Sequence, residues 1–350
     1  MAKSWAARLC RLPQQEFFVA QELTKTVKLK CCGIWGIYNH LTSCLTKKNM
    51  KMKFYLYLSL ILCCSCTMNE DKKEMLGDDY RLYKATAAWE LAQAVQEEDT
   101  TKIQKIIVDE HIPVDFREPK YSQTLLMLAV RTNKELSVKK LLELGADPNA
   151  HDDSTKYLGE NAVIIASRFT RPSNTILKSL LEFGGNPNAT TCGVQKNNEG
   201  NIVPIRMFAL SYAVGVSFDK VKLLVDAGAN IDYSTSTHET ALESCMIHDR
   251  MDIMLYLLQK GANIHTEFYE VDFNRPNYPT FIVNILYKLR KCAYPLNSKE
   301  FQEKMKVVEF LKNNGLDYRN SPIPPESIEI IKNDMKFSSE EDFDHYLQFY

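Results

Sequence analysis

Most of this chain lacks cysteine, an excess of basic charge and any common catalytic motif. Only Cys192, Cys245 and Cys292 follow residue 66, and no Cys-x-x-Cys pair occurs among them. A disulfide framework and a zinc ribbon are therefore excluded there. Residues 67–350 hold 33 basic and 42 acidic residues, a net charge of −9. This acidic body argues against nucleic acid as a partner, because phosphate neutralisation needs a basic face.

Catalytic signatures are missing as well. The chain has no glycine-rich phosphate loop, no His-Glu-x-x-His and no Gly-x-Ser-x-Gly motif, which are the common marks of nucleotide, zinc and serine chemistry. Histidines with acidic neighbours occur as isolated pairs, which arise by chance in a chain with seven histidines. We therefore predict a protein that is not an enzyme and that holds no cofactor and no metal.

Residues 1–66 have a different composition. They hold 10 of the 43 basic residues, 2 of the 44 acidic residues and seven of the ten cysteines. Four lysines between Lys47 and Lys53 precede a run of 13 uncharged residues, Phe54 to Cys66. The run is too short for a helix that crosses a hydrocarbon core of roughly 30 Å. A basic stretch followed by a short apolar one is the pattern of a secretory signal peptide.

The end of this run, Ser65-Cys66 followed by TMNEDKKE, resembles a bacterial lipoprotein signal. In such signals the cysteine after a small residue is lipidated and becomes the mature N-terminus. The resemblance covers about 15 residues and departs from the usual pattern in having Cys63 where leucine is usual. It implies a signal peptide at 50–66 and a lipid on Cys66, since bulkier residues precede Cys64. A plain secretory signal and a short membrane-dipping helix are the alternatives.

One stretch recurs through the rest of the chain as an apolar helical end, a glycine and a tight polar turn. It reads LLELGADPNA at 141–150, LLEFGGNPNA at 180–189, LLVDAGANIDY at 223–233, YLLQKGANIHT at 256–266 and, more faintly, EFLKNNGLDYR at 309–319. Self-similarity at this spacing is typical of a stacked repeat protein. The turn glycines lie 39, 44, 33 and 54 residues apart, so insertions separate the repeats.

The clearest unit, 122–152, resembles an ankyrin repeat. That pattern runs Thr-Pro-Leu-His, then an alanine, a second helix ending Val-x-x-Leu-Leu, and Gly-Ala-Asp-x-Asn. The matching residues are Thr124, Leu126, Ala129, Val138, Leu141, Leu142, Gly145, Ala146, Asp147 and Asn149. Thr124 can cap the first helix, and Gly145 stands where a left-handed residue ends the second. The Pro and His of the pattern are absent from every unit, so we expect a less regular and less stable array.

The repeats predict an all-α repeat solenoid, an ankyrin-repeat stack of helix-turn-helix units with β-turn or hairpin fingers. The predicted division is an untranslated or non-structural leader at 1–49, a signal peptide at 50–66, a flexible tether at 67–84, about six repeats at 85–320 and C-terminal capping helices at 321–350. The first unit, 85–115, is degenerate, and the first helix of the last is expected at 281–289. Ser338 and Glu341 have the spacing of a capping box. The aromatic tail could instead be a docking peptide.

We predict the binding surface in the four fingers that follow the turns, at 151–160, 190–204, 233–239 and 266–278, because the copies stop resembling one another there. The candidate residues are Asp152, Asp153, Tyr157, Asn198, Glu199, Tyr233, His238, Glu239, Phe268, Tyr269, Phe273 and Tyr278. The four aromatics at 268–278 either anchor an interface or fold back on their own repeat. The acidic residues of this side favour a basic partner, or they form only a solvated face. Cys245 replaces the small alanine of the repeat and is predicted to be a buried packing residue.

These observations predict a non-enzymatic, monomeric protein-binding scaffold, exported and held at a bacterial membrane in the cell envelope by a lipid on Cys66. One alternative is an inhibitor or immunity-type protein that blocks a toxin or an enzyme in the envelope. The other is an enzyme with an unrecognised site in the insertions at 190–204 or 266–300. A metal bound by His238, His248 and Cys292 would be the mark of such a site.

A signal peptide at 50–66 implies that translation starts at Met50 or Met52 and that residues 1–49 are never made; the alternative is a genuine long leader, such as an amphipathic anchor. We expect mass spectrometry of the mature N-terminus to find acylated Cys66 as the first residue. A peptide from 1–49 in the mature protein would contradict the late start, and an unmodified Cys66 would contradict the lipid.

Overall fold

The computed structural model describes residues 75–350 except 156, 197–199, 205, 236–237 and 272–279. The leader, the signal segment with Cys66 and the first part of the predicted tether lie outside the described residues. All the described residues belong to one compact unit, Met75–Tyr350.

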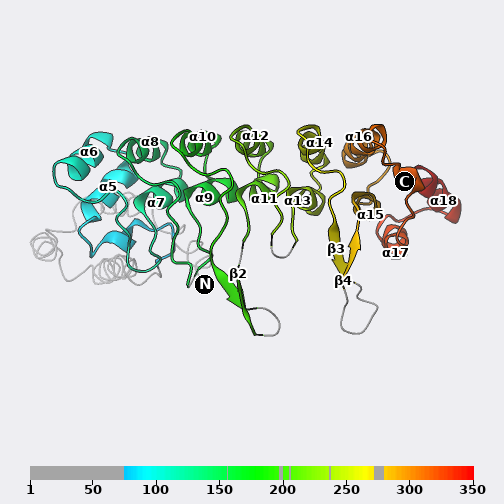
Figure 1. Cartoon of the computed structure of the whole chain (residues 1–350), viewed down its shortest axis with the longest axis horizontal. Helices are drawn as coiled ribbons and strands as arrows, with labels where there is room; N and C mark the ends of the chain where they lie inside the picture. The colour runs from blue at the N-terminus through cyan, green and yellow to red at the C-terminus, as the bar shows by residue number, and fades with distance from the viewer. Residues whose placement is uncertain (1–74, 156, 197–199, 205, 236–237, 272–279) are drawn as a thin grey trace, which may run out of the picture. The chain divides into compact units, whose positions relative to one another are not determined.

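Successive helix pairs build this unit. They are α5 (Trp89–Glu97) with α6 (Thr100–Val108), α7 (Leu125–Arg131) with α8 (Glu135–Glu143), α9 (Ala162–Arg168) with α10 (Asn174–Glu182), α11 (Ala209–Val214) with α12 (Phe218–Asp226), α13 (Ala241–Ile247) with α14 (Met251–Gln259), and α15 (Ile285–Lys291) with α16 (Lys299–Asn313). The first helices of the pairs form one row and the second helices another (Figure 1). The predicted all-α repeat solenoid is confirmed.

Two β-hairpins extend from the row of first helices, on the side away from the second helices (Figure 1). Strand β1 (Val194–Lys196) pairs antiparallel with β2 (Ile202–Pro204). Strand β3 (Phe268–Val271) pairs antiparallel with β4 (Thr280–Val283). Because 280–283 take part in β4, the last repeat's first helix begins at Ile285 and not at Phe281 as predicted.

Small side chains allow the first helices to pack closely. Ala129, Ala166, Ala213 and Cys245 occupy the same position in successive units, and all four are fully buried. Burial raises the pKa of the Cys245 thiol and keeps it protonated. The prediction that Cys245 is a packing residue is confirmed, and Leu289 takes the same place in the last pair.

In most units, the residue directly before the first helix caps it with a side-chain oxygen, which accepts a hydrogen bond from a backbone N–H of the first turn. Thr124, Asn161, Thr240 and Asn284 each accept a hydrogen bond from the backbone N–H three residues on, over 3.4, 2.9, 3.2 and 3.0 Å. Such caps supply an acceptor to an amide that has none within the helix. The predicted role of Thr124 is confirmed.

The turn after each second helix from α8 to α16 has a left-handed glycine, whereas the turn after α6 has His111 with a φ of 57°. The φ angles of Gly145, Gly184, Gly228, Gly261 and Gly315 are 91°, 88°, 90°, 98° and 89°. This backbone conformation is costly for a residue with a Cβ atom. The glycine lets the chain leave the helix and enter the tight polar turn beyond it.

Adjacent turns are joined by a ladder of hydrogen bonds, which we call the turn ladder. Side-chain oxygens of one turn accept from a backbone N–H of the next: Asp115 from Asp147, Asn149 from Asn186, Asn188 from Asn230, and Asp232 from Asn263, over 3.2, 2.8, 2.6 and 2.8 Å. The repeated polar residues of the turns therefore fix the spacing and register of neighbouring repeats.

The ordered body begins earlier than the sequence indicates. Residues Tyr80–Tyr83 form a 3₁₀ helix, η2, and Tyr83 is fully buried with its hydroxyl donating to the Gln123 carbonyl over 2.8 Å. Tyr80 pairs with the Thr132 hydroxyl at 2.8 Å. The predicted flexible tether is therefore wrong for residues 75–84, because this segment packs against α5 and bonds to residues on both sides of α7.

The C-terminal helices α17 (Pro325–Asp334) and α18 (Glu340–Phe349) follow a short 3₁₀ helix, η3 (Tyr318–Asn320). Ile331, Phe343, Tyr346 and Tyr350 form a separate small core, and the Tyr350 hydroxyl donates to the Arg290 carbonyl of α15. Helix α18 is capped by Ser339, which accepts from the Asp342 N–H over 3.1 Å. The predicted capping box at Ser338 is wrong by one residue.

Gly145→Ala should destabilise the fold by about 1 kcal/mol, because no atom lies within 4 Å of the added Cβ and the cost is that of the left-handed backbone alone. Urea denaturation measures the change. Gly77→Ala is the matched control, since its Cβ also meets nothing within 4 Å and its φ is not left-handed. Equal effects of the two substitutions would contradict the requirement for glycine in the turn.

Candidate functional site

Polar side chains follow the row of first helices and the bases of the fingers. We call this chain of contacts the inner-face ladder. Its members are Arg131, Asp152, Glu160, Arg168, Ser211, Tyr212, Glu239, Glu243, Ser244, Glu270, Lys288 and Lys291. The inner-face ladder lies where the first helices meet the finger bases.

At the N-terminal end of the ladder, one buried carboxylate lies between two arginines. Glu160 Oε2 is 2.8 Å from Arg131 Nη2, and Glu160 Oε1 is 2.5 Å from Arg168 Nη1. The arginines end α7 and α9, where a cation is favoured by the helix dipole. The Arg168 guanidinium also lies 5.3 Å from the centre of the Tyr212 ring, which continues the ladder into the next repeat.

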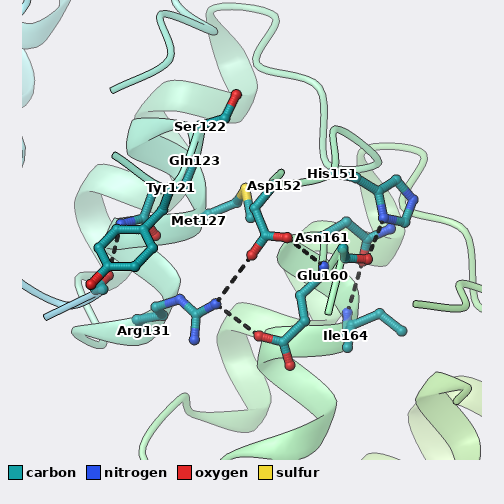
Figure 2. A network of polar contacts seen from close by, with 12 residues as sticks. Tyr121, Ser122, Gln123, Met127, Arg131, His151, Asp152, Glu160, Asn161 and Ile164 are labelled. Atoms are coloured by element: carbon teal, nitrogen blue, oxygen red, sulfur yellow. Dashed lines mark hydrogen bonds and ion pairs between the residues drawn. The ribbon is translucent and has the colours of Figure 1, made fainter. Parts of the chain in front are cut away.

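Asp152 is less well satisfied than Glu160, as Figure 2 shows. Its Oδ1 accepts from the Glu160 N–H over 2.9 Å, but its Oδ2 is 3.8 Å from Arg131 Nη2. Burial, together with repulsion from Glu160, raises the pKa of Asp152 to about 6. Within the described part of the chain, the buried Arg131 Nε finds no hydrogen-bond partner. Incompletely satisfied buried polar groups of this kind are a feature of functional sites.

The middle of the ladder is a hydroxyl and carboxylate cluster. Glu239 Oε1 accepts from the Ser211 hydroxyl over 2.9 Å and lies 3.3 Å from the Ser244 hydroxyl. The two hydroxyls are 2.8 Å apart. The third finger is thereby fixed to α11 and α13.

The C-terminal end fixes the fourth finger to α15. Lys288 Nζ lies 2.7 Å from both Glu243 and Glu270, and Lys291 Nζ lies 2.6 Å from the second Glu270 oxygen. Burial by itself would raise the pKa of Glu270, but the hydrogen bonds from the two lysines outweigh it and hold that pKa below its usual range. The base of the β3–β4 hairpin is therefore held by ion pairs that are mostly shielded from water.

A hollow of about 450 Å³ opens beside the N-terminal end of the ladder. Tyr121, Arg131, Asp152, Tyr157 and Glu160 line it, together with Gly77, Gln123, Leu158 and Val194. The rings of Tyr121 and Tyr157 are 4.9 Å apart between centroids. The hollow thus combines aromatic walls with the charged groups of the ladder.

Comparison with known proteins agrees with this geometry. Residues 121–153 match the family model of the ankyrin repeat. This segment is an ankyrin repeat. Several of the other helix pairs share its side-chain cap, its left-handed glycine or its turn ladder. Stacks of this kind indicate a protein-binding scaffold.

Two similar proteins carry the same repeat. A curated relative is the Ankyrin repeat and KH domain-containing protein mask-1 of Caenorhabditis elegans, 26% identical over 179 residues. The match covers 47% of this chain and 7% of that protein's length. Among solved structures, an ankyrin repeat domain from Acinetobacter baumannii AYE is 23% identical with a TM-score of 0.46, covering 64% of this chain and 97% of the other.

The ankyrin stack brings some of the predicted binding residues together. Asp152 and Tyr157 line the same hollow, and Asp153 lies beside them in the first finger. His238 of the third finger stacks on Tyr269 of the fourth, with ring centroids 3.8 Å apart. Contact between these two fingers was not evident from the sequence.

Other predicted residues have internal roles. Phe268 is fully buried in the main core, so it covers its own repeat and its place in the predicted interface is wrong. Tyr233 is half-buried against Phe208, at 4.9 Å between ring centroids. Glu239 is engaged by the serines of the ladder. The predicted site residues Cys66, Asn198, Glu199, Phe273 and Tyr278 lie outside the described residues.

Sequence reasoning missed the residues that organise the ladder. Arg131 and Arg168 both stand seven residues after a helix cap, and Glu160 stands directly before one. A comparison of corresponding positions in the repeats could have found the arginine pair. Pairing of both arginines with Glu160 needed the three-dimensional packing of the repeats.

Among the described residues no group of three or more His, Cys, Asp and Glu side chains is placed to hold a metal ion. His238, His248 and Cys292 form no such group in this part of the chain. None of the described helices has both the length and the apolar character needed to cross a membrane.

Asp152→Asn keeps an oxygen for the Glu160 amide and removes a charge that burial disfavours. Because the pKa of Asp152 is raised from 3.8 to about 6, the folded state holds this proton more tightly than the unfolded state. The stabilisation from protonation is complete below about pH 4 and is lost as the pH rises through about 6. We expect the variant to gain about 1 kcal/mol at pH 7.5, allowing for partial solvation, and nothing at pH 4.

Urea denaturation at the two pH values measures this difference. Asp153→Asn, which removes the neighbouring charge, controls for a general effect of net charge. The same gain at pH 4 and pH 7.5 would contradict the assignment of a buried, proton-binding Asp152.

Proposed function

We propose that this chain is a protein-binding scaffold whose contact surface is the finger side of its ankyrin stack. The observation that carries the proposal is the exposure of large apolar side chains on firmly held hairpins. Val194 and Ile202 of β1 and β2 are 44% and 69% exposed, and Val271 and Ile282 of β3 and β4 are 38% and 56% exposed. Apolar side chains gathered on a projecting element are typical of an interaction surface.

The register of the fourth finger gathers several of these side chains on one face. Tyr269 pairs with Ile282 across the two strands, and Val271 lies on the same face as Tyr269 because side chains alternate along a strand. Tyr269 in turn stacks on His238. We call these four residues, His238, Tyr269, Val271 and Ile282, the finger patch.

The finger patch is held in place before any partner arrives. The opposite face of the hairpin carries Phe268 in the core and Glu270 between two lysines. A surface that is already ordered loses less conformational entropy on binding. The ion pairs of the ladder therefore support affinity without contacting the partner.

The charge of the partner is less constrained than the composition indicates. Asp152, Glu239 and Glu270, counted as acidic surface from the sequence, are bonded within the ladder. Asp153 and the exposed Glu267 still give this side negative charge. A preference for a basic partner is therefore proposed to act locally rather than across the whole face.

We further propose that the protein is exported and anchored by a lipid on Cys66 at a bacterial membrane. Met75 lies nine positions after Cys66, a length of chain that spans at most about 30 Å. The Met75 carbonyl accepts from Lys120 Nζ and the Tyr121 hydroxyl, over 2.8 and 3.1 Å, on the rim of the hollow. Such an anchor would keep the first finger close to the membrane surface and favour a partner located there.

The Val271→Ser/Ile282→Ser variant tests the finger patch. Both side chains point away from the core, so the fold should be retained while capture of a partner from envelope extracts falls by about tenfold or more. Leu136→Ser is the matched control, because Leu136 is 60% exposed on α8 in the other row of helices. Quantitative mass spectrometry of the captured proteins compares the variants. An unchanged set of partners in the double variant would overturn the proposal.

A further inference from the structure

The hollow beside Asp152 has charged side chains of both signs. Among the described residues that line it, these are Arg131, Asp152 and Glu160. Glu160 uses both oxygens for arginines, at 2.8 Å from Arg131 and 2.5 Å from Arg168. Asp152 has no such close arginine contact.

Asp152 retains capacity for another cation. Its Oδ1 is used by the Glu160 N–H, whereas Arg131 Nη2, the described cation that is paired with Oδ2, lies 3.8 Å away, too far for a hydrogen bond. A partly buried carboxylate oxygen without a close hydrogen-bond partner binds a charged hydrogen-bond donor strongly, because much of its desolvation has already occurred on folding. Asp152 is one of the residues that line the hollow, and Figure 2 shows its carboxylate between Arg131 and the Glu160 N–H.

Two aromatic rings, those of Tyr121 and Tyr157, also line the hollow. The rings of Tyr121 and Tyr157 are both half-buried and lie 4.9 Å apart. The ammonium of Lys120 already lies 4.9 Å from the centre of the Tyr121 ring, so this wall has one cation within the molecule. Aromatic faces attract cations, and guanidinium groups also stack on them through their flat surface.

We infer that this hollow binds the guanidinium group of an arginine from a partner protein, with Asp152 accepting its N–H groups and Tyr157 stacking on its plane. The inference rests on the proposed function, since the partner supplies the arginine. A planar guanidinium satisfies a carboxylate and an aromatic wall together, which an ammonium does less well. The hollow would thereby select an arginine placed beside the apolar contacts of the fingers.

Binding should depend on pH through Asp152. The charged and titratable groups that face it are Arg131 from α7 and His151 and Glu160 from its own finger. An arginine binds the ionised form of Asp152, so affinity falls as the pH drops through about 6. Between pH 7.5 and pH 5 the loss is about tenfold.

The test is an NMR titration of the full chain with acetyl-Gly-Arg-Gly amide, compared with the same peptide containing citrulline, its uncharged isostere. We expect the arginine peptide to bind about tenfold more tightly than the citrulline peptide, and Asp152→Asn to remove that preference and its pH dependence. Tyr157→Leu should weaken the arginine peptide several-fold. Asp153→Asn, the matched control, should change affinity by less than about threefold.

Equal binding of the two peptides, an unaltered Asp152→Asn variant, or equal losses in Asp152→Asn and Asp153→Asn would each overturn the inference. Folding of the variants is checked by their urea denaturation midpoints. The peptide titration needs no partner protein, so its failure is distinct from failure of the finger patch. If the protein shows no preference for the arginine peptide but still captures its partner, the inference about the hollow fails and the proposal of a protein-binding scaffold stands.

Discussion

The turn ladder is the interaction on which the rest of the structure depends. A left-handed glycine follows the second helix in every pair after the first, and polar residues of the turns bond to the backbone of the next turn. The helices are only six to nine residues long in most units, too short to be stable alone. Their stability comes from stacking, and the ladder fixes the register in which they stack. Because the turns carry this register, the fingers beyond them are free to differ.

Both ends of the stack need cover, since a terminal repeat has a neighbour on one side only. At the N-terminal end the cover is Tyr80 and Tyr83. At the C-terminal end two buried cations lie under aromatic rings: Arg290 Cζ is 3.9 Å from the Tyr318 ring and Lys304 Nζ is 4.0 Å from the Tyr350 ring. Burial lowers the pKa of Lys304 to about 7. At this end, aromatic rings therefore pack against buried charged groups, so the covering core is not purely apolar.

The inner-face ladder holds the fingers to the stack through polar contacts. Buried ion pairs contribute little net stability, because desolvation offsets their attraction. Here these ion pairs fix the positions of neighbouring elements. Lys288 and Lys291 hold the fourth finger through Glu270. Glu160 aligns two repeats. Asp152 is the member that this network satisfies least. A charge kept at a cost in stability is best explained by a role in binding.

The sequence by itself determined the repeat, because its requirements are local. Thr124 caps a helix, Gly145 takes the left-handed turn position, and Ala129 is small enough for close helix packing. It also indicated the finger side as the variable side. Only the tertiary structure decided what each finger residue does. Phe268 and Val271 are three residues apart, yet one is buried and the other exposed, because the pairing of β3 with β4 assigns their faces. The contacts of Glu160 with Arg131 and Arg168 join residues 29 and 8 positions apart, and no local pattern encodes such packing between repeats.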